Sequence, residues 1–176
     1  WNALCISAYV NAFRTFGEEA FLEKAIGAAN YFKNNSVSAD GEVLRMVRKS
    51  SNIPGFLDDY SLLAQVFIDL YQATFDEKWL ILSQRITDYT LRHFYDESSG
   101  MFFYSGLEEG GTISNKIETS DNVIPASNSV LAKVLVQLGL YFDKEDYTEK
   151  AEHMLKNMLP QLDRNTAFHS NWADLL

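Results

Sequence analysis

Two consecutive aspartates, Asp58 and Asp59, follow a Gly-Phe-Leu turn at the start of "GFLDDYSLLAQVFIDLYQATFD", residues 55–76. Acids in the first turn of a helix satisfy free backbone N–H groups and oppose the helix dipole, which is worth about 0.3 to 1 kcal/mol. Alternatively, a carboxylate here faces a ligand pocket. Because successive helical residues diverge by about 100°, we expect Asp59, with Tyr60, at the pocket wall, and we do not expect both acids to face one ligand.

A second polar group, "ETSDNVIPASNS", carries Glu118 and Asp121 ahead of another apolar segment. A proline at a helix start, followed by Ser127 or Asn128 as a cap, would explain it structurally. Glycoside hydrolysis instead needs two carboxylates flanking one bond, about 5.5 Å apart for retention or about 6.5 to 9.5 Å apart for inversion. The catalytic combination that we predict is Asp59 with Asp121 or Glu118.

Polar and aromatic residues precede each of three apolar helical segments, as Trp-Asn, Asp-Asp-Tyr and Ser-Asn. Aromatic rings stack on the apolar faces of sugars, and acids and amides bind hydroxyls, so this inventory favours a sugar-like small molecule. Arg45 and Arg48 are three apart in a strand-like segment and point to opposite faces. They are surface charges, or one reaches over the pocket to hold an anionic group. The substrate-binding residues that we expect are Trp1, Asn2, Asp58, Tyr60, Arg45, Arg48 and Asn128.

The three histidines do not suit a sugar epimerase, which would use histidine as its acid and base. His93 ends a helical segment, where cation and dipole agree, and His153 lies on an amphipathic segment expected to face solvent. His169 precedes a helical segment that is barely present. No metal-ligand or redox spacing occurs, and Cys5 lies in an apolar run typical of a buried small hydrophobe. We therefore expect no metal and no cofactor.

The composition excludes several classes of protein. The 176 residues, 47% of them hydrophobic, suffice for one domain with a core. A net charge of −9 repels phosphate backbones, so we expect no nucleic-acid partner. No apolar stretch approaches the ~20 residues of a membrane span and no signal peptide is visible, so we expect no membrane partner and a cytoplasmic protein. Because the chain starts at Trp1 inside a helical pattern, we expect a fragment of a longer protein.

Helical periodicity dominates the chain, and the helices form pairs that repeat. The pairs cover residues 1–35, 55–94 and 125–160. In each pair an apolar helix ends in a phenylalanine, followed by a short acidic turn and a more amphipathic helix. These phenylalanines are Phe16, Phe75 and Phe142.

The stretches between the pairs alternate like short strands at residues 41–48 and 101–105, and Gly110-Gly111 marks a turn. Three helical hairpins, each with a more apolar first helix, predict two concentric layers. Six such hairpins would close a ring. We therefore predict an all-α fold of αα-hairpin repeats forming part of an (α/α)6 toroid, with short β-hairpin inserts.

The segment "GFLDDYSLLAQVFIDLYQATFDEKWL" is similar to a block of the spermatogenesis-associated thioredoxin-domain proteins, which join an N-terminal thioredoxin-like domain to a six-hairpin toroid. The segments "WNALCISAYVNAFRTFG" and "DNVIPASNSVLAKVLVQLG" resemble two further blocks of that family in the same order. The resemblance implies that residues 1–176 are one partial toroid domain, with the thioredoxin-like domain and part of the toroid absent. It also implies a fold shared with six-hairpin glycosidases and N-acylglucosamine 2-epimerases.

The chain departs from that family just before Asp121. The family usually carries an arginine and a lysine where this chain has Asn115 and Ile117. If those basic residues bind a substrate anion in the relatives, that function is altered here, unless the displaced Lys116 substitutes.

Two functions stay open. The first is a carbohydrate-active or carbohydrate-binding toroid domain, glycosidase-like or epimerase-like and active in carbohydrate metabolism, which needs acid and base groups converging in one concavity. The alternative is a non-catalytic scaffold or protein-interaction domain associated with a thioredoxin-like domain, which needs only a surface patch. Three hairpins would leave inner-helix flanks uncovered near Trp1 and Leu176, so we expect self-association.

Overall fold

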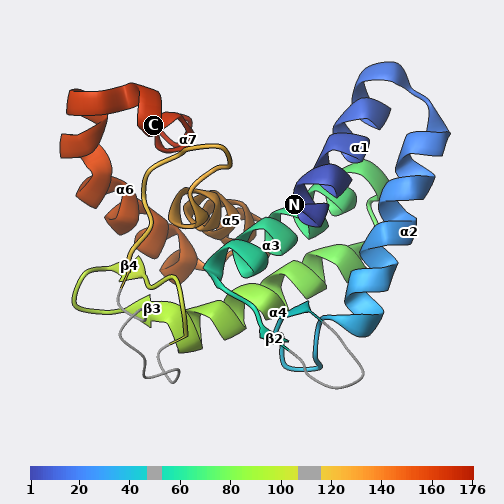
Figure 1. Cartoon of the computed structure of the whole chain (residues 1–176), viewed down its shortest axis with the longest axis horizontal. Helices are drawn as coiled ribbons and strands as arrows, with labels where there is room; N and C mark the ends of the chain where they lie inside the picture. The colour runs from blue at the N-terminus through green and yellow to red at the C-terminus, as the bar shows by residue number, and fades with distance from the viewer. Residues whose placement is uncertain (47–52, 107–115) are drawn as a thin grey trace.

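The computed structural model describes residues 1–46, 53–106 and 116–176, and within them helices predominate (Figure 1). The long helices are α1 (Asn2–Phe16), α2 (Glu19–Asn35), α3 (Leu57–Thr74), α4 (Glu77–Phe94), α5 (Ser127–Phe142) and α6 (Glu145–Asn165). A 3-10 turn (Thr166–Phe168) leads into the short α7 (Ser170–Ala173). The strands are β1 (Leu44–Met46), β2 (Ile53–Pro54), β3 (Tyr95–Asp96) and β4 (Met101–Phe102).

The helices pair in sequence order, α1 with α2, α3 with α4 and α5 with α6, and α3 also packs between α1 and α5. The first helices of the hairpins therefore form one inner layer and the second helices an outer one. Figure 1 shows α1 and α7 on opposite sides of α3 and α5, so the hairpins follow an arc. The predicted all-α hairpin fold is confirmed. No helix of the described ranges is both long and apolar enough to cross a membrane.

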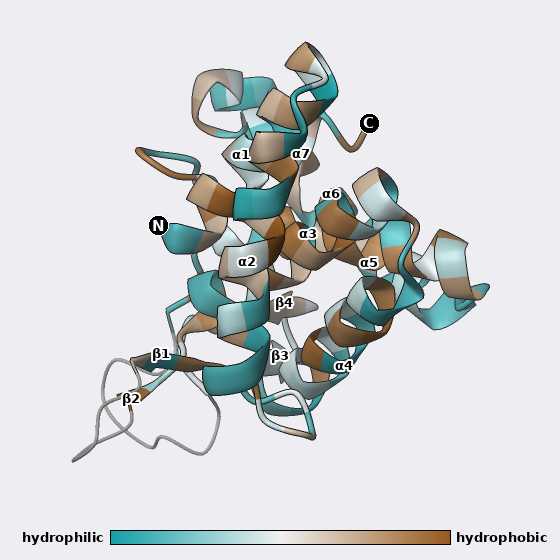
Figure 2. Cartoon of the chain, turned by 90° about the vertical axis from the view of Figure 1, so that its right-hand side faces the viewer, coloured by the Kyte–Doolittle hydropathy of each residue, from teal (hydrophilic) through white to brown (hydrophobic). Residues whose placement is uncertain are grey.

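The position of each helix in the arc decides how much of it is buried. The central helices α3 and α5 each bury ten residues, whereas α1 buries only Ile6 and Val10. Figure 2 shows hydrophobic colour gathered on α3 in the interior and hydrophilic bands along α2. Cys5, expected to be buried, is exposed. It stands about 100° around the helix from Ile6, on a side of α1 that no described element covers.

The three hairpin turns share one backbone feature. Each first helix is followed by a residue in the left-handed region: Gly17 (φ 70°), Phe75 (φ 56°) and Asp143 (φ 52°). Such a residue lets its N–H bond a carbonyl of the last turn and stops the helix. Phe75 is thus equivalent to Gly17 and Asp143. The prediction from the sequence that placed Phe75 at the position of Phe16 and Phe142 is wrong by one residue, because Phe16 and Phe142 each precede the left-handed residue.

Two short β-hairpins join the helical pairs. β1 pairs with β2 through Leu44–Pro54 and Met46–Ile53, and β3 pairs with β4 through Tyr95–Phe102 and Asp96–Met101. The expected strand at residues 41–48 is shorter than predicted, and its last two residues and Gly110-Gly111 lie outside the described residues. Both inserts reach the start of α3, because the Gly55 N–H donates to the Val43 carbonyl (2.8 Å) and the Leu57 N–H donates to the Tyr104 carbonyl (2.9 Å).

Candidate functional site

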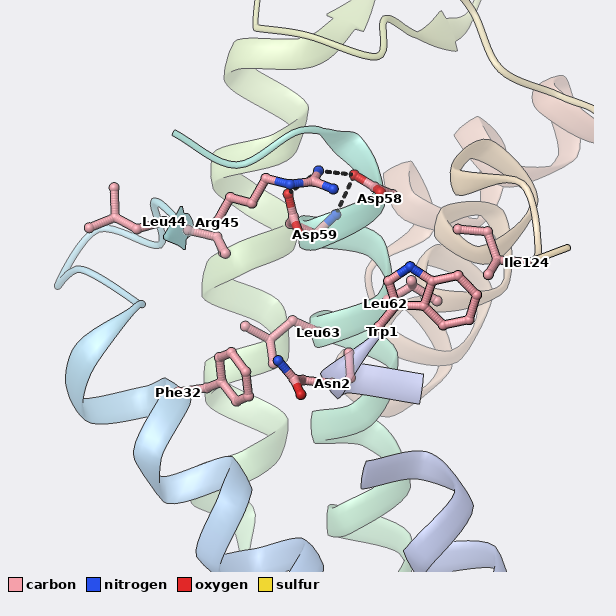
Figure 3. A pocket seen from close by; sticks show the side chains of 12 residues that line it. Trp1, Asn2, Phe32, Leu44, Arg45, Asp58, Asp59, Leu62, Leu63 and Ile124 are labelled. Carbon is pink, nitrogen blue, oxygen red and sulfur yellow. Dashed lines mark hydrogen bonds and ion pairs between the residues drawn. The ribbon is translucent and has the colours of Figure 1, made fainter. Parts of the chain in front are cut away.

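A pocket of about 100 Å³ lies where the first turns of α1 and α3 meet β1 (Figure 3). Its polar wall is formed by Arg45, Asp58 and Asp59, and the rest is mainly apolar. The lining residues are Trp1, Asn2, Ala3, Phe32, Val43, Leu44, Arg45, Asp58, Asp59, Leu62, Leu63 and Ile124. The pocket therefore combines two acids, a cation, an amide and aromatic rings, as expected for a site that binds a polar organic molecule.

The Arg45 guanidinium joins the two aspartates. Its Nη1 lies 3.1 Å from Asp59 Oδ2 and 3.4 Å from Asp58 Oδ1, and Figure 3 shows it beside both carboxylates. Asp59 Oδ2 also accepts the Phe56 N–H (3.0 Å), and Asp58 Oδ1 accepts the Asp59 N–H (3.0 Å). Both acids thus bond free N–H groups at the helix start and also line the pocket. Because Arg45 contacts both carboxylates, the two acids share one wall of the pocket, and whether both face one ligand stays a prediction.

Burial is the main cause of the raised pKa of Asp59, and the neighbouring charge of Asp58 raises it further. The Phe56 N–H and the Arg45 charge oppose this rise without cancelling it. Burial alone would lower the pKa of Arg45, but the charges of Asp59 and Asp58 outweigh burial and raise it. Arg45 therefore stays cationic, and Asp59 holds a proton more readily than an ordinary aspartate.

Aromatic residues that the sequence did not single out support Arg45. Its guanidinium lies over the Phe56 ring, 5.3 Å from the centroid. Phe56 stacks on Tyr104 with centroids 5.2 Å apart and planes 8° apart, and the Lys116 ammonium lies 5.9 Å from the Tyr104 centroid. Tyr104 lies in the aromatic-rich stretch 94–106, and no spacing in the sequence relates it to Phe56 or Arg45. The stack fixes the cation above the aspartates.

Asp121 does not line this pocket. Its Oδ1 accepts the Ala126 N–H (2.9 Å) and its Oδ2 accepts the Asn171 N–H (2.9 Å), so it joins the start of α5 to the start of α7. Burial would raise the pKa of Asp121, but these two amide hydrogen bonds, together with those from the side chains of Asn171 and Ser129, outweigh burial and hold the pKa below the usual value. Asp121 is 8% exposed, and these contacts serve structure.

Glu118 and Asn128 also lie outside the pocket lining. Glu118 Oε2 accepts from the Ser127 hydroxyl (2.8 Å) and N–H (3.3 Å) at the start of α5. Asn128 is fully buried. Its Oδ1 accepts the Phe102 N–H (2.9 Å), and its Nδ2 donates to the Phe102 carbonyl (3.0 Å) and the Glu118 carbonyl (2.9 Å). Among the described residues, the lining of the pocket at Arg45 therefore includes Asp59 but neither Asp121 nor Glu118.

Some of the remaining predicted substrate-binding residues line the pocket and others do not. Trp1, 76% exposed, and Asn2 line the pocket. Tyr60 is 2% exposed and does not line it. Its ring stacks on Tyr89 with centroids 5.6 Å apart, and burial raises its pKa. Arg48 lies outside the described residues.

No histidine lines this pocket. The His93 ring stacks on Tyr89, with centroids 4.1 Å apart. His169 is buried, with Nδ1 2.9 Å from the Asn165 carbonyl oxygen and Nε2 3.4 Å from Ser120 Oγ. In the described part of the chain, no three His, Cys, Asp or Glu residues are grouped to hold a metal ion. The acid and base groups of the pocket are therefore carboxylates.

Curated relatives confirm the resemblance proposed from the sequence. The chain is 28% identical over 166 residues to human spermatogenesis-associated protein 20, a match that covers 88% of the chain and 21% of that protein. It is 26% identical over 174 residues to an uncharacterized protein of Caenorhabditis elegans, covering 92% of the chain and 23% of that protein. The chain thus spans about a fifth of the length of these relatives. No protein-family model matches it.

Solved structures confirm the fold. A family 76 α-mannanase of Bacteroides thetaiotaomicron superposes with a TM-score of 0.71 at 15% identity, covering 91% of this chain and 43% of that one. An α-1,6-mannanase of Salegentibacter gives 0.72 at 14% identity, covering 90% and 46%. The latter is an inactive variant, with two consecutive aspartates replaced by asparagine, in complex with α-1,6-mannotriose. Cellobiose 2-epimerase of Spirochaeta thermophila gives 0.69 at 17% identity, covering 89% and 41%. The fold is therefore part of an (α/α)6 toroid, as predicted.

Proposed function

We propose that the pocket at Arg45, Asp58 and Asp59 binds a carbohydrate and that the two aspartates cleave a glycosidic bond. One observation carries the proposal: Asp58-Asp59 is the only pair of consecutive aspartates in the chain, and both line a pocket beside the stack of Arg45 on Phe56. The Salegentibacter mannanase shares the fold and is inactive when two consecutive aspartates are replaced. The proposed substrate class is accordingly an α-linked mannoside.

The electrostatics divide the roles between the two acids. Asp59, with its raised pKa, is the proposed general acid and protonates the leaving glycosidic oxygen. Asp58, whose Oδ1 accepts the Asp59 N–H, is the proposed nucleophile, which bonds to the sugar carbon as the leaving oxygen departs. Water, deprotonated by Asp59, then breaks this bond and releases the sugar. This assignment follows the rule that paired carboxylates in different environments take opposite roles. It replaces the pairing of Asp59 with Asp121 or Glu118, which do not line the pocket.

The spacing of the two acids supports one stereochemical outcome. Because Arg45 Nη1 is within 3.4 Å of Asp58 Oδ1 and 3.1 Å of Asp59 Oδ2, these two oxygens are at most about 6.5 Å apart, the lower limit for an inverting pair. Retaining enzymes place their carboxyl groups about 5.5 Å apart. The proposed reaction is therefore hydrolysis with retention of the anomeric configuration.

The test is turnover of α-1,6-linked mannose oligomers, followed by release of reducing ends and by the anomeric NMR signal of the first product. We expect Asp58→Asn and Asp59→Asn each to lower the rate by at least about 10²-fold. The matched control is Asp163→Asn, because Asp163 is exposed on the outer helix α6, and it should leave the rate unchanged. A wild-type chain that neither binds nor cleaves any of these sugars would refute the proposal.

Exposed apolar side chains favour a second function, protein association. At the hairpin-turn end of the arc, Phe16 is 67% exposed, Phe75 79% and Leu140 75%. Exposed apolar side chains that form a contiguous patch mark contact sites on proteins. We propose that this chain self-associates or docks a protein through them. Light scattering at micromolar concentration tests self-association, and a monodisperse monomer unchanged by Phe75→Ser would contradict it.

A further inference from the structure

A second, larger pocket adjoins the first on the concave side of the arc. It has a volume of about 420 Å³ and shares Ala3 and Leu62 with the pocket at Arg45. Its walls come from α1, α3, α5 and the α7 region, which Figure 1 shows around the open side of the arc. The lining residues are Ala3, Leu4, Ser7, Asn11, Leu62, Gln65, Asp69, Pro125, Val130, Lys133, Gln137, Asn171 and Asp174.

The centre of this second pocket is a row of amides around one carboxylate. Asp69 Oδ2 accepts the Ser7 hydroxyl (2.7 Å), and Asp69 Oδ1 accepts the Gln65 amide (3.0 Å). The same Gln65 Nε2 lies 3.2 Å from Gln137 Oε1, so the row crosses from α1 over α3 to α5. The side chain of Asn11 adds a further exposed amide on α1. Amides donate and accept hydrogen bonds and a carboxylate accepts them, so this row can bind neighbouring hydroxyl groups, which both donate and accept.

The charges of the second pocket favour an uncharged ligand. Lys133 donates to Asn171 Oδ1 (3.1 Å) and pairs with Asp174 Oδ2 (2.7 Å). The pocket thus holds one cation and two carboxylates, Asp69 and Asp174. A phosphate or carboxylate ligand would meet net negative charge, whereas hydroxyl groups would find both donors and acceptors.

The first pocket is too small to hold a whole small-molecule ligand. Small-molecule sites commonly enclose about 300 to 1,000 Å³, so a pocket of about 100 Å³ holds only part of such a ligand. A molecule that reaches Asp58 and Asp59 must extend elsewhere. The adjoining pocket of about 420 Å³ is of sufficient size and of matching polarity.

We infer that the second pocket binds further sugar units of an oligosaccharide whose reacting end lies at Asp58 and Asp59. This inference rests on the proposed function and specifies its substrate: a linear, uncharged oligosaccharide in preference to a single sugar. Gln65, Asp69 and Gln137 bind its hydroxyls, and Ala3 and Leu62 form the apolar passage between the two pockets.

Calorimetric titration with α-1,6-linked mannose oligomers of one to four units tests the inference. The wild-type chain should bind the trimer at least about tenfold more tightly than the monosaccharide. Gln137→Ala should weaken trimer binding about three- to tenfold, the loss of one or two hydrogen bonds, and leave monosaccharide binding unchanged. Gln161→Ala, at an exposed position of α6, is the matched control. Asn11→Ala, at an exposed position of α1, should act like Gln137→Ala without disturbing α5.

The outcomes separate the two proposals. Equal affinity for all lengths, or a chain-length gain that survives both amide variants, would overturn the inference while leaving the proposed function intact. Trimer binding that depends on Gln137 but is unaffected by Asp58→Asn and Asp59→Asn, in a chain that cleaves nothing, would support the second pocket and overturn the proposed function. No binding of any oligomer would overturn both.

Discussion

Replacing Arg45 with methionine should destabilise the chain and raise the pKa of Asp59 further. Methionine keeps an apolar stem against Phe56 but removes the cation that contacts both carboxylates at 3.1 and 3.4 Å. A pair of unit charges at ~4 Å is worth about 1 kcal/mol in water and about 4 kcal/mol at an effective dielectric constant of ~20. Because the Arg45 side chain is 39% exposed, solvent screening brings the loss near the lower value, about 1 kcal/mol.

That loss corresponds to a fall of about 2 to 4 °C in the melting temperature, and removal of the Arg45 charge, which opposes the rise, raises the pKa of Asp59 further. The pKa of Asp59 is already raised, so the folded state binds its proton more tightly than the unfolded chain. Protonation therefore favours folding at low pH, and this gain is lost as the pH rises through the folded-state pKa. Without Arg45, protonation of Asp59 stabilises the folded state more than it does in the wild type. The free energies of unfolding of wild type and variant should therefore differ most near pH 7 and least near pH 4.

Two measurements check this prediction: carboxyl carbon NMR of Asp59 through a pH titration, and thermal unfolding of both proteins at several pH values. Arg45→Lys is the control, because lysine keeps the charge and loses the planar guanidinium. If Arg45→Met lowers the melting temperature equally at pH 4 and pH 7, Arg45 stabilises the chain by packing on Phe56, and the electrostatic account is refuted.

Three further predictions concern residues away from the pocket, all measured by urea unfolding. Asp121→Asn should cost about 1 to 2 kcal/mol, because one amide oxygen cannot replace two carboxylate oxygens that accept the Ala126 and Asn171 N–H groups. Since the pKa of Asp121 is lowered, the wild-type advantage should be present above the usual aspartate pKa and disappear as the pH falls; a pH-independent difference would contradict this. Phe75→Gly should stabilise the chain by about 0.5 to 1 kcal/mol, because the backbone of Phe75 is in the left-handed region and its side chain is 79% exposed. A loss of stability as large as that of Phe16→Gly within α1 would show that the turn carries no strain. Asn128→Ala should cost about 2 to 4 kcal/mol, because it leaves the buried Phe102 N–H unpaired; a cost below that of an exposed asparagine would refute the role of this contact.

The fold and the Asp58-Asp59 position could be predicted from the sequence because both depend on local pattern. Apolar residues at helical spacing define the hairpins, and acids after a Gly-Phe-Leu turn mark the start of α3. The register of the turns could not be predicted. Glycine at position 17 favours a left-handed conformation there. The chain adopts the same conformation at Phe75, where the residue type does not indicate it.

The partners of the site residues could not be predicted either, because they come from distant parts of the chain. Arg45 is held by the stack of Phe56 on Tyr104, and no spacing rule relates these three positions. Asp121 is removed from the candidate pocket by its bonds to Asn171, fifty residues away. A carboxylate near a helix start therefore reads the same in sequence, whether it faces a ligand or two backbone amides.

The side chain of Asn128 imitates a neighbouring strand, since its amide pairs with both the N–H and the carbonyl of Phe102. Two residues further on, the Tyr104 carbonyl accepts the Leu57 N–H at the start of α3, and the Tyr104 ring stacks on Phe56. The third helical hairpin is thereby connected mechanically to the aspartate pair on the second. The Phe102 amide proton should exchange with deuterated solvent only when the first turn of α5 opens, and this exchange rate reports how firmly the third hairpin holds the wall of the pocket.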